Sequence, residues 1–455
     1  MRAAARYPFT LAAALAAACG GTDRAPAPGA ESATSGESAG AAAPAAAGVT
    51  VPEGFHVGVF AENLGSVRHA VAAGDGVVYV NTLRSTYDTG KRVPPGGFVV
   101  ALRDTDGDGK ADVVRRFGPT SESGSHGGTG IAISRDRLYV EADSAILRYA
   151  LAAGDPVPSG EPDTIVKGLP IEGGHTSRPF VVDGAGSLFV NVGSETNACQ
   201  AEDRQAGSRG RRPCTELERR AGIWRFSSER TGQRYTPGAR YATGIRNANG
   251  LAVDAGGRLY ATQHGRDQLA ENWPKLFDWK QSAELPAEEL LRIEKGGDYG
   301  WPYCYYDGEQ GKLVLAPEYG GDGKQVGDCG EKLGPVAAFP AHWAPNALAF
   351  YHGTSFPARY RGGAFIAFHG SWNRAPEPQA GYNVTFQPMK DGKASGAYEV
   401  FADGFAGARK EPGLAAHRPA GLAVGPSGEL FITDDQAGTV WRVTYNSAGD
   451  AAASR

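Results

Sequence analysis

Polar clusters recur along the chain and contain the residue types that acid–base and anion-binding chemistry need. They are SGSHGGTG with His126, EGGHTSRP with His175 and Arg178, TGIRNANG with Arg246 and Asn247, TQHG with Gln263, FHGSWNR with Arg374, and AAHRPAG with Arg418. A histidine can accept a proton near neutral pH, and arginine matches carboxylates with paired hydrogen bonds. Any one of these residues could simply tie a turn together. Their recurrence between apolar stretches favours a shared, positively charged pocket for a planar or carboxylated ligand.

The elements that must position these clusters are repeated pairs of strands. The repeat is an apolar stretch, a turn rich in Asp, Gly or Asn and a second apolar stretch, found at 70–82, 130–142, 180–193, 250–263, 347–370 and 421–435. Val, Ile, Tyr and Phe at the strand positions are typical of β-structure. Six copies predict an all-β, six-bladed β-propeller, which accommodates this many strands better than a two-sheet sandwich does. The segment FHVGVFAE at 55–62 is expected to complete the last blade, and the site should lie beside the repeated strands.

Composition agrees with this fold class and excludes one class of partner. Of the 455 residues, 65 are glycine, roughly twice the average usage, which points to many tight turns and argues against an all-helical protein. Lys and Arg number 46 against 50 Asp and Glu, so the formal net charge is −4. A chain this close to neutral lacks the basic excess that a nucleic-acid-binding protein needs.

The N-terminal sequence is typical of an exported protein. Residues 1–18 combine early arginines with a short Ala- and Leu-rich stretch, which predicts a signal peptide. Cys19 follows small residues as in a bacterial lipoprotein, which favours lipidation of Cys19; cleavage among the alanines beside a bystander cysteine is the alternative. Residues 19–48 are expected to be a flexible tether rich in Ala, Pro, Gly and Ser. The propeller is then expected at 49–447, followed by a disordered tail at 448–455.

The remaining cysteines form an even set. They are Cys199, Cys214, Cys304 and Cys329. In an oxidising compartment, four cysteines allow three disulfide connectivities, of which the local pairing 199–214 and 304–329 is the simplest. Zinc binding is the alternative, but the spacing of these cysteines does not support it. Two disulfides are therefore predicted.

The longest motifs resemble a known family. They are GLPIEGGHTSRPFVVDGAGSLFVNVG, TGIRNANGLAVDAGGRLYATQHGRDQL, LPAEELLRIEKGGDYGWPYC and RPAGLAVGPSGELFITDDQAGTVWRV. Over roughly residues 51–445, the chain resembles the dehydrogenases of sugars that depend on pyrroloquinoline quinone (PQQ). These are six-bladed propellers related to soluble glucose dehydrogenase, and the chain looks closest to their L-sorbosone dehydrogenase-like branch.

The resemblance implies roles for particular residues. His175 matches the catalytic base, which takes the proton of the substrate hydroxyl while hydride moves to the quinone. Arg246 matches the arginine that polarises the quinone carbonyl. The residues matched to cofactor contacts are Arg178, Asn247, Gln263, Arg374 and Arg418, and His126 falls on the substrate side.

The resemblance also implies a Ca²⁺ ion that bridges protein and PQQ. Its ligands would be the side chain of Gln263 and the backbone carbonyls of His264 and Gly265, and hard oxygen ligands suit Ca²⁺. The chain departs from the glucose enzyme where Gly174 replaces an acidic residue and where a longer insertion follows TQHG. Glu288 and Glu289 end that insertion, as structural calcium ligands or as the cap of a helix.

A second acidic motif lies outside these clusters. DTDGDGKAD places Asp104, Asp106 and Asp108 at alternate positions, like the start of an EF-hand loop. The twelfth position is Arg115, where such a loop needs a bidentate Glu. A polar hairpin turn explains the same residues, so both interpretations stand.

Together, the sequence predicts a PQQ- and Ca²⁺-dependent dehydrogenase that oxidises a sugar or sugar aldehyde outside the cytoplasm. It would be periplasmic or anchored to the cell envelope by a lipid on Cys19. Because no CxxCH haem motif is present, electrons would leave to a separate acceptor, a quinone or a cytochrome. A propeller that binds a carbohydrate or a partner protein without turnover is the alternative. A lactonase-type hydrolase is weaker, because the clusters offer Arg and His rather than carboxylates.

Overall fold

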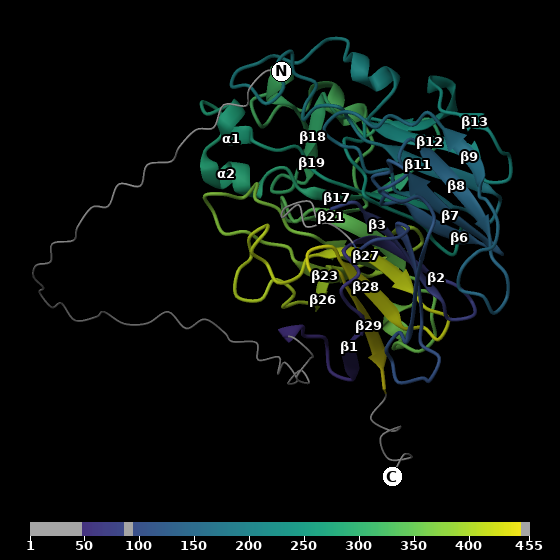
Figure 1. The fold of residues 1–455 in the computed structure, drawn as a ribbon. Coiled ribbons are helices and arrows are strands. Elements are labelled where there is room, and N and C mark those ends of the chain that lie inside the picture. Colours follow the sequence, from purple (N-terminus) through teal and green to yellow (C-terminus); the bar gives the residue numbers. More distant parts are fainter. Residues whose placement is uncertain (1–47, 86–93, 447–455) are drawn as a thin grey trace, which may run out of the picture. The chain divides into compact units, whose positions relative to one another are not determined.

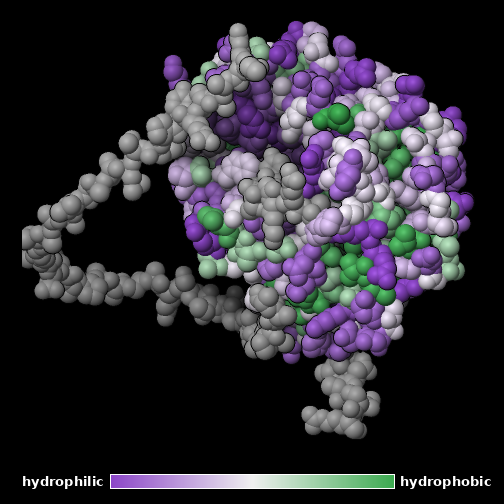
Figure 2. Space-filling view, viewed as in Figure 1, coloured by the Kyte–Doolittle hydropathy of each residue, from purple (hydrophilic) through white to green (hydrophobic). Residues whose placement is uncertain are grey.

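The computed structural model of the chain describes residues 48–85 and 94–446. The predicted signal peptide, Cys19, nearly all of the tether and the tail at 448–455 lie outside the described residues and stay predictions. Within the described part, we find no helix with the length and apolar character needed to cross a membrane. The face seen in Figure 2 is largely hydrophilic, and its apolar residues form small separate patches.

The described residues form a six-bladed propeller in which each blade contains four antiparallel strands (Figure 1). Blade 1 contains β2 (Ser66–Ala72), β3 (Val78–Leu83), β4 (Val99–Arg103) and β5 (Val113–Phe117). Blade 2 contains β6 (Ile131–Ser134), β7 (Arg137–Ala142), β8 (Ala145–Ala150) and β9 (Asp163–Lys167), and β13 (Gln233–Arg234) pairs with β9. Blade 3 contains β10 (Phe180–Val182), β11 (Ser187–Val192), β12 (Gly222–Ser227) and β14 (Arg240–Thr243).

The other three blades follow the same order. Blade 4 contains β15 (Gly250–Val253), β16 (Leu259–Gln263), β17 (Glu288–Ile293) and β20 (Ala337–Phe339). Blade 5 contains β21 (Pro345–Phe350), β22 (Ala364–Phe368), β23 (Asn383–Gln387) and β26 (Glu399–Ala402). Blade 6 contains β27 (Pro419–Val424), β28 (Leu430–Asp434), β29 (Thr439–Tyr445) and β1 (Phe55–Ala61).

Short elements lie in the loops between these strands. The α-helices are α1 (Leu269–Asn272) and α2 (Trp279–Glu284), and the hairpins are β18 (Cys304–Asp307) with β19 (Lys312–Leu315) and β24 (Met389–Lys390) with β25 (Lys393–Ala394). The 3₁₀ helices are η2 (Thr215–Glu218), η3 (Pro237–Ala239), η4 (Pro317–Tyr319), η5 (Gly327–Glu331) and η6 (Ala358–Tyr360).

Strand β1 closes the ring of blades. It pairs antiparallel with β29, with Phe55 opposite Tyr445 and Val59 opposite Trp441, so the purple N-terminal strand lies beside the yellow C-terminal ones (Figure 1). The prediction that the segment at 55–62 completes the last blade is confirmed.

Packing between blades explains why many strands are apolar on both faces. All six residues of β11 and all five of β22 are buried, because each inner sheet is covered on two sides by its neighbours. The first strands of the blades contact one another in a closed cycle around the axis. A cavity of about 220 Å³ lies between them, lined by residues that are apolar except for His69.

One of the repeated turns shows a local cause of hairpin formation. In the turn between β15 and β16, Asp254 Oδ1 accepts hydrogen bonds from the backbone N–H groups of Gly256 (2.9 Å) and Arg258 (3.0 Å). Gly257 has a φ of 74°, in the left-handed region that glycine adopts without steric cost. The Asp and Gly residues of this turn therefore encode its hairpin.

Both predicted disulfides are present. Cys199 pairs with Cys214 and Cys304 pairs with Cys329. The local connectivity is therefore confirmed, and the zinc alternative is wrong.

Candidate active site

A cavity of about 560 Å³ opens where two families of loops meet. One family precedes the first strand of a blade and contributes Thr129, His175, Arg178, Arg246, Asn247 and Arg418. The other follows the second strand and contributes Asp143, His264, Asp267, His369 and Trp372. Because these strands are antiparallel neighbours, both families lie at the same end of the propeller.

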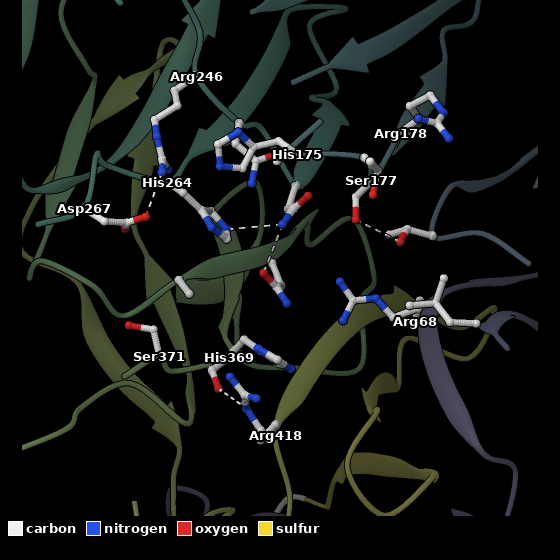
Figure 3. A pocket seen from close by; sticks show the side chains of 18 of the residues that line it. Arg68, His175, Ser177, Arg178, Arg246, His264, Asp267, His369, Ser371 and Arg418 are labelled. Atoms are coloured by element: carbon white, nitrogen blue, oxygen red, sulfur yellow. Dashed lines mark hydrogen bonds and ion pairs between the residues drawn. The ribbon is translucent and has the colours of Figure 1, made fainter. Parts of the chain in front are cut away.

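Most of the predicted site residues line this cavity. They are His126, His175, Arg178, Arg246, Asn247, His264, Gly265 and Arg418, and five of them are labelled in Figure 3. Gln263 is buried outside the lining and touches it through Arg246, whose backbone N–H donates to Gln263 Oε1 at 2.7 Å. Residues far apart in sequence therefore converge on one cavity.

The contacts of His175 determine its tautomer. Its Nδ1 lies 2.9 Å from Ser194 Oγ and 3.0 Å from Ser194 O. Ser194 Oγ donates its only hydrogen to Thr196 O at 2.6 Å. Both Ser194 oxygens are thus acceptors toward the ring, so Nδ1 carries the hydrogen and Nε2 keeps its lone pair. No residue in the described part of the chain hydrogen-bonds to Nε2.

The surroundings of His175 favour the neutral ring. Burial, together with the positive charge of Arg246, lowers the pKa of His175 well below its usual value. Gly193 permits this close packing, since a Cβ there would lie 2.6 Å from the Cβ of His175. His175 is therefore an unprotonated base at neutral pH.

The guanidinium of Arg246 donates four hydrogen bonds to described residues and keeps one N–H group. Its Nε and Nη2 donate to Asn197 O (3.1 Å) and Asn197 Oδ1 (2.9 Å), Nη2 also donates to Asp267 Oδ2 (2.8 Å), and Nη1 donates to Gly265 O (2.8 Å). A guanidinium has five N–H groups, so one Nη1 hydrogen has no partner among the described residues and is left for a ligand. Burial opposes ionisation of Asp267, but the guanidinium groups of Arg246 and Arg204 hold its pKa below the usual range.

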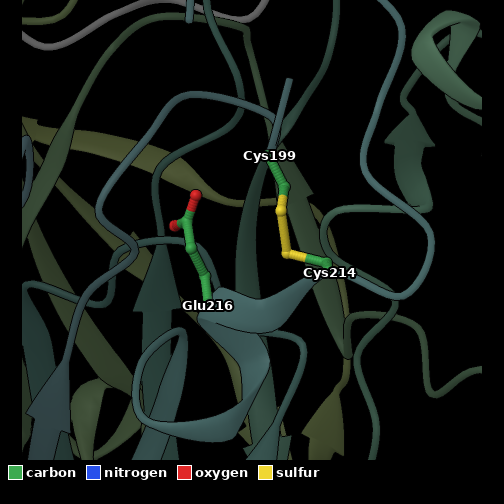
Figure 4. Close-up of side chains that lie close together, drawn as sticks. All are labelled: Cys199, Cys214 and Glu216. Carbon is green, nitrogen blue, oxygen red and sulfur yellow. A yellow bond between two sulfur atoms is a disulfide. The ribbon is translucent and has the colours of Figure 1, made fainter. Parts of the chain in front are cut away.

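One short segment supports both the base and this arginine. Glu216, on η2, accepts hydrogen bonds from the backbone N–H groups of Glu195 (2.8 Å) and Thr196 (3.1 Å) and from Thr196 Oγ1 (2.5 Å). The Cys199–Cys214 disulfide links the end of the same segment to the start of η2 (Figure 4). Segment 194–199 is therefore fixed by a buried carboxylate and a covalent bond.

A second group of basic side chains lines another part of the cavity (Figure 3). Asp435 accepts from Arg68 Nη1 at 2.5 Å and lies 2.7 Å from His369 Nε2. Arg418 Nη2 donates to Gly370 O at 2.6 Å. Among the described residues, the buried Arg68 Nε has no hydrogen-bond partner, and such orphaned donors suit a ligand.

The lining carries more positive than negative charge. The arginines are Arg68, Arg178, Arg204, Arg246 and Arg418, and the carboxylic acids are Glu141, Asp143, Asp267 and Glu288. Burial raises the pKa of Glu288 to about 8, so this acid is mostly protonated at neutral pH. The cavity can therefore accept a ligand with several carboxylates.

The expected calcium ligands have suitable chemistry. Gln263 Oε1 and Gly265 O each accept one hydrogen bond from Arg246, and each carbonyl oxygen has a second lone pair for a cation. Glu289 Oε1 accepts from Gln263 Nε2 at 2.7 Å, and its buried Oε2 has no hydrogen-bond partner in the described chain. Hard oxygens beside a buried carboxyl group fit Ca²⁺.

Arg374 does not reach the cavity, contrary to the prediction. Its guanidinium donates to Glu284 Oε1 (2.5 Å), Ala283 O (2.7 Å) and Pro378 O (2.9 Å). These partners clamp the loop after β22 onto α2. Arg374 is thus a structural residue, although its sequence context resembles that of Arg418.

Other predictions also change in detail. Glu288 and Glu289 lie within strand β17 and cap no helix. The His126 side chain lies at the rim with 72% of its surface exposed, 3.5 Å from Asp143. The carboxylates of Asp104, Asp106 and Asp108 lie within 4.8 Å of one another, and calcium binding there stays a prediction.

Four residues of the site were missed by the sequence analysis. They are Arg68, Ser194, Asp267 and His369. Ser194 and His369 follow the second strand of their blades at nearly the same position as His264. A comparison of the repeats at that position would have identified these two.

A family model described as TrAA12-like matches residues 50–446. The chain belongs to the TrAA12-like family. Among known proteins, an uncharacterised protein of Borreliella burgdorferi (strain ATCC 35210 / DSM 4680 / CIP 102532 / B31) is 29% identical over 189 residues. That match covers 41% of this TrAA12-like chain and 43% of the Borreliella protein, so it spans less than half of that curated relative.

Solved structures share the fold of this TrAA12-like protein. The calcium structure of the Trichoderma reesei family AA12 enzyme has a TM-score of 0.68 at 17% identity, covering 88% of this chain and 98% of that one. The holo PQQ domain of pyranose dehydrogenase from Coprinopsis cinerea has a TM-score of 0.67 at 16% identity, covering 87% and 97%. The PQQ-bound aldose sugar dehydrogenase from Streptomyces coelicolor has a TM-score of 0.52 at 19% identity, covering 87% and 100%. At these identities the likeness establishes the six-bladed propeller.

Proposed function

We propose that this TrAA12-like protein is a PQQ- and Ca²⁺-dependent dehydrogenase that oxidises the hydroxyl or hydrated aldehyde of a sugar of the aldose or sorbosone type. One observation carries the proposal: Ser194 holds His175 as the Nδ1–H tautomer, beside an Arg246 with one N–H group left to donate. A binding protein would need neither an unprotonated base nor a donor reserved beside it.

Polar groups in and beside the cavity would bind PQQ and Ca²⁺. Arg68 and Arg418 would hold carboxylates of PQQ, and Asn247, whose buried Oδ1 has no hydrogen-bond partner in the described chain, would contact the ring system. Gln263, His264 and Gly265 would hold Ca²⁺ through oxygens. When bound, PQQ supplies a two-electron acceptor for hydride.

The chain's own residues would then move one proton and orient the substrate. His175 Nε2 takes the hydroxyl proton, and the imidazolium that results still donates from Nδ1 to Ser194. The free Nη1 hydrogen of Arg246 is offered to an electron-rich oxygen in the cavity. Because Asp267 pairs with Arg246 at 2.8 Å, the guanidinium stays in place during this step.

The disulfides bear on the compartment in which the reaction would take place. Two disulfides indicate an extracytoplasmic protein. We propose in addition that the protein is periplasmic or anchored to the cell envelope by a lipid on Cys19, and that a separate quinone or cytochrome accepts the electrons.

The experiment that tests this function follows the reduction of an artificial dye by the purified chain, with aldoses, sugar alcohols and sugar aldehydes as substrates. We expect turnover only when both PQQ and Ca²⁺ are present. Turnover without either addition would contradict the proposal. A sugar bound without any dye reduction would support the carbohydrate-binding alternative.

A further inference from the structure

An exposed segment rich in arginine lies beside the active-site cavity. Residues 204–212 have the sequence RQAGSRGRR, which contains no acidic residue. Its arginines, all exposed, are Arg204, Arg209, Arg211 and Arg212. We call residues 204–212 the arginine segment. It concentrates positive charge in a chain whose net charge is −4.

The fold places the arginine segment at the cavity end of the propeller. It follows β11, the second strand of blade 3, just as the cavity-lining loops of blades 4 and 5 follow their second strands. Arg204 lines the cavity, where its Nη2 donates to Asp267 Oδ2 at 2.9 Å and its Nε lies 3.8 Å from Asp203 Oδ2. The segment therefore begins at the edge of the cavity and continues along the surface.

Contacts with neighbouring residues fix the backbone of the arginine segment. Gln200 Nε2 donates to Gln205 O at 3.3 Å and to Ser208 O at 3.2 Å. Gln200 Oε1 accepts from the backbone N–H of Arg204 at 2.8 Å. The Cys199–Cys214 disulfide closes the loop that contains the segment. Because this backbone is already ordered, little entropy is lost when a partner docks on it.

Three of the arginines have no carboxylate partner among the described residues. Arg209 makes neither a hydrogen bond nor an ion pair with the described part of the chain. Arg211 Nη2 donates to a backbone carbonyl at 3.0 Å. The Arg212 guanidinium lies over the rings of Tyr303 and Tyr319, 5.3 and 5.2 Å from their centres. The arginine segment therefore presents positive charge to solvent, where it attracts acidic surfaces.

The composition of the arginine segment favours a protein partner over a lipid bilayer. The segment contains no large apolar side chain that could enter the hydrocarbon of a bilayer. Arginine matches the carboxylates of an acidic protein with paired hydrogen bonds, and charged contacts suit the fast, short-lived encounters of redox partners. A protein docked here lies beside the cavity in which the reduced cofactor would be held.

We propose that the arginine segment is the docking surface for the electron acceptor, and that this acceptor is an acidic one-electron redox protein. Oxidation of one sugar hydroxyl releases two electrons and two protons. Two acceptor molecules would dock in turn and take one electron each, and the two protons would pass to water. This inference rests on the proposed function.

The kinetic test uses the PQQ- and Ca²⁺-loaded protein with plastocyanin, an acidic copper protein, as the acceptor. At low ionic strength, Arg209→Glu/Arg211→Glu should reduce plastocyanin more slowly by about tenfold or more. Added salt should slow the wild-type reaction and narrow this difference. Reduction of an artificial dye should stay at the wild-type rate, because neither arginine lines the cavity.

The matched control is Arg115→Glu/Arg234→Glu, which changes the net charge by the same amount. Arg115 and Arg234 are exposed and lie on the outer strands β5 and β13. This control should slow the reduction of plastocyanin by less than about twofold. Equal losses in the control and in Arg209→Glu/Arg211→Glu would overturn the docking surface.

A binding measurement separates this inference from the proposed function. The ¹⁵N spectrum of labelled plastocyanin, recorded with the unlabelled protein at low salt, needs no turnover. Its lines should broaden with the wild type and the control but not with Arg209→Glu/Arg211→Glu. If the loaded protein oxidises no sugar, the proposed function fails while this spectrum still decides the docking surface. Unchanged plastocyanin binding in the variant, or binding of phosphatidylglycerol vesicles or polygalacturonate in place of plastocyanin, would overturn the inference.

Discussion

The Glu216 carboxylate accepts two hydrogen bonds from Thr196, one from the Thr196 backbone N–H at 3.1 Å and one from Thr196 Oγ1 at 2.5 Å. Through these two hydrogen bonds, η2 fixes segment 194–199. In that segment, Ser194 contacts the His175 ring and Asn197 accepts a hydrogen bond from Arg246. The two residues that we assign to the chemistry therefore depend on one short piece of backbone.

The two disulfides provide a matched test of this dependence. They separate cysteines by 15 residues in 199–214 and by 25 in 304–329, so each should contribute about 3 kcal/mol to the free energy of unfolding. Replacing either pair with serine should lower the melting temperature by a similar amount. Only Cys199→Ser/Cys214→Ser should also lower kcat, by about tenfold or more, measured below both melting temperatures. Equal effects of both pairs on kcat would contradict the positioning role of segment 194–199.

Ser194 should control the tautomer of His175. Ser194→Ala removes the hydroxyl that accepts from Nδ1 and leaves only the backbone oxygen. We expect kcat to fall by about tenfold, because a fraction of the rings then carries the hydrogen on Nε2. The ¹⁵N shifts of the His175 ring should report this mixture directly. A wild-type spectrum with hydrogen on Nε2 would refute the assignment of the base.

The low pKa of His175 predicts where activity is lost in acid. Burial and Arg246 stabilise the neutral ring, and a base works only when unprotonated. As the pH falls, kcat/KM should therefore stay constant through about 6.5, the ordinary histidine value, and drop only below it. A pH profile of the loaded enzyme checks this. An acid limb centred above about 6.5 would mean that His175 is not the titrating base.

Arg374 and Arg418 should respond differently to substitution. Arg374→Met removes a buried clamp on Glu284, Ala283 and Pro378. It should cost about 2–4 kcal/mol of folding free energy and leave PQQ affinity nearly unchanged. Arg418→Met should instead weaken PQQ binding by about 10- to 100-fold. Calorimetric unfolding and PQQ titration of both variants separate the two effects, and weaker PQQ binding in Arg374→Met would restore the original prediction.

The fold was predictable because its signals are local and repeated. Each Asp- and Gly-rich turn, such as that of Asp254 and Gly257, forms its own hairpin. The series of six hairpins has one strand without a partner near each end. Closing the series into a ring lets these two strands pair with each other. The pairing of β1 with β29 follows from that count.

The site was only partly predictable because its contacts cross between blades. Arg374 and Arg418 both follow glycine- or histidine-containing loops, yet the partners supplied by α2 hold Arg374 away from the cavity. Arg68 meets Asp435 across the seam between the first and last blades, 367 residues away. No local pattern in the chain encodes such a pair.

In the proposed function, this cavity binds PQQ with the help of Ca²⁺ and uses His175 as the base. The most direct measurement titrates the purified protein with PQQ, in Ca²⁺ and in EDTA, and then adds sugar in a single turnover while the quinone absorbance is recorded. We predict stoichiometric binding only with Ca²⁺, and reduction of the bound quinone that is slower by about 10²–10⁴-fold in His175→Gln, with binding retained. Absence of PQQ binding, or equally fast reduction in His175→Gln, would contradict the account.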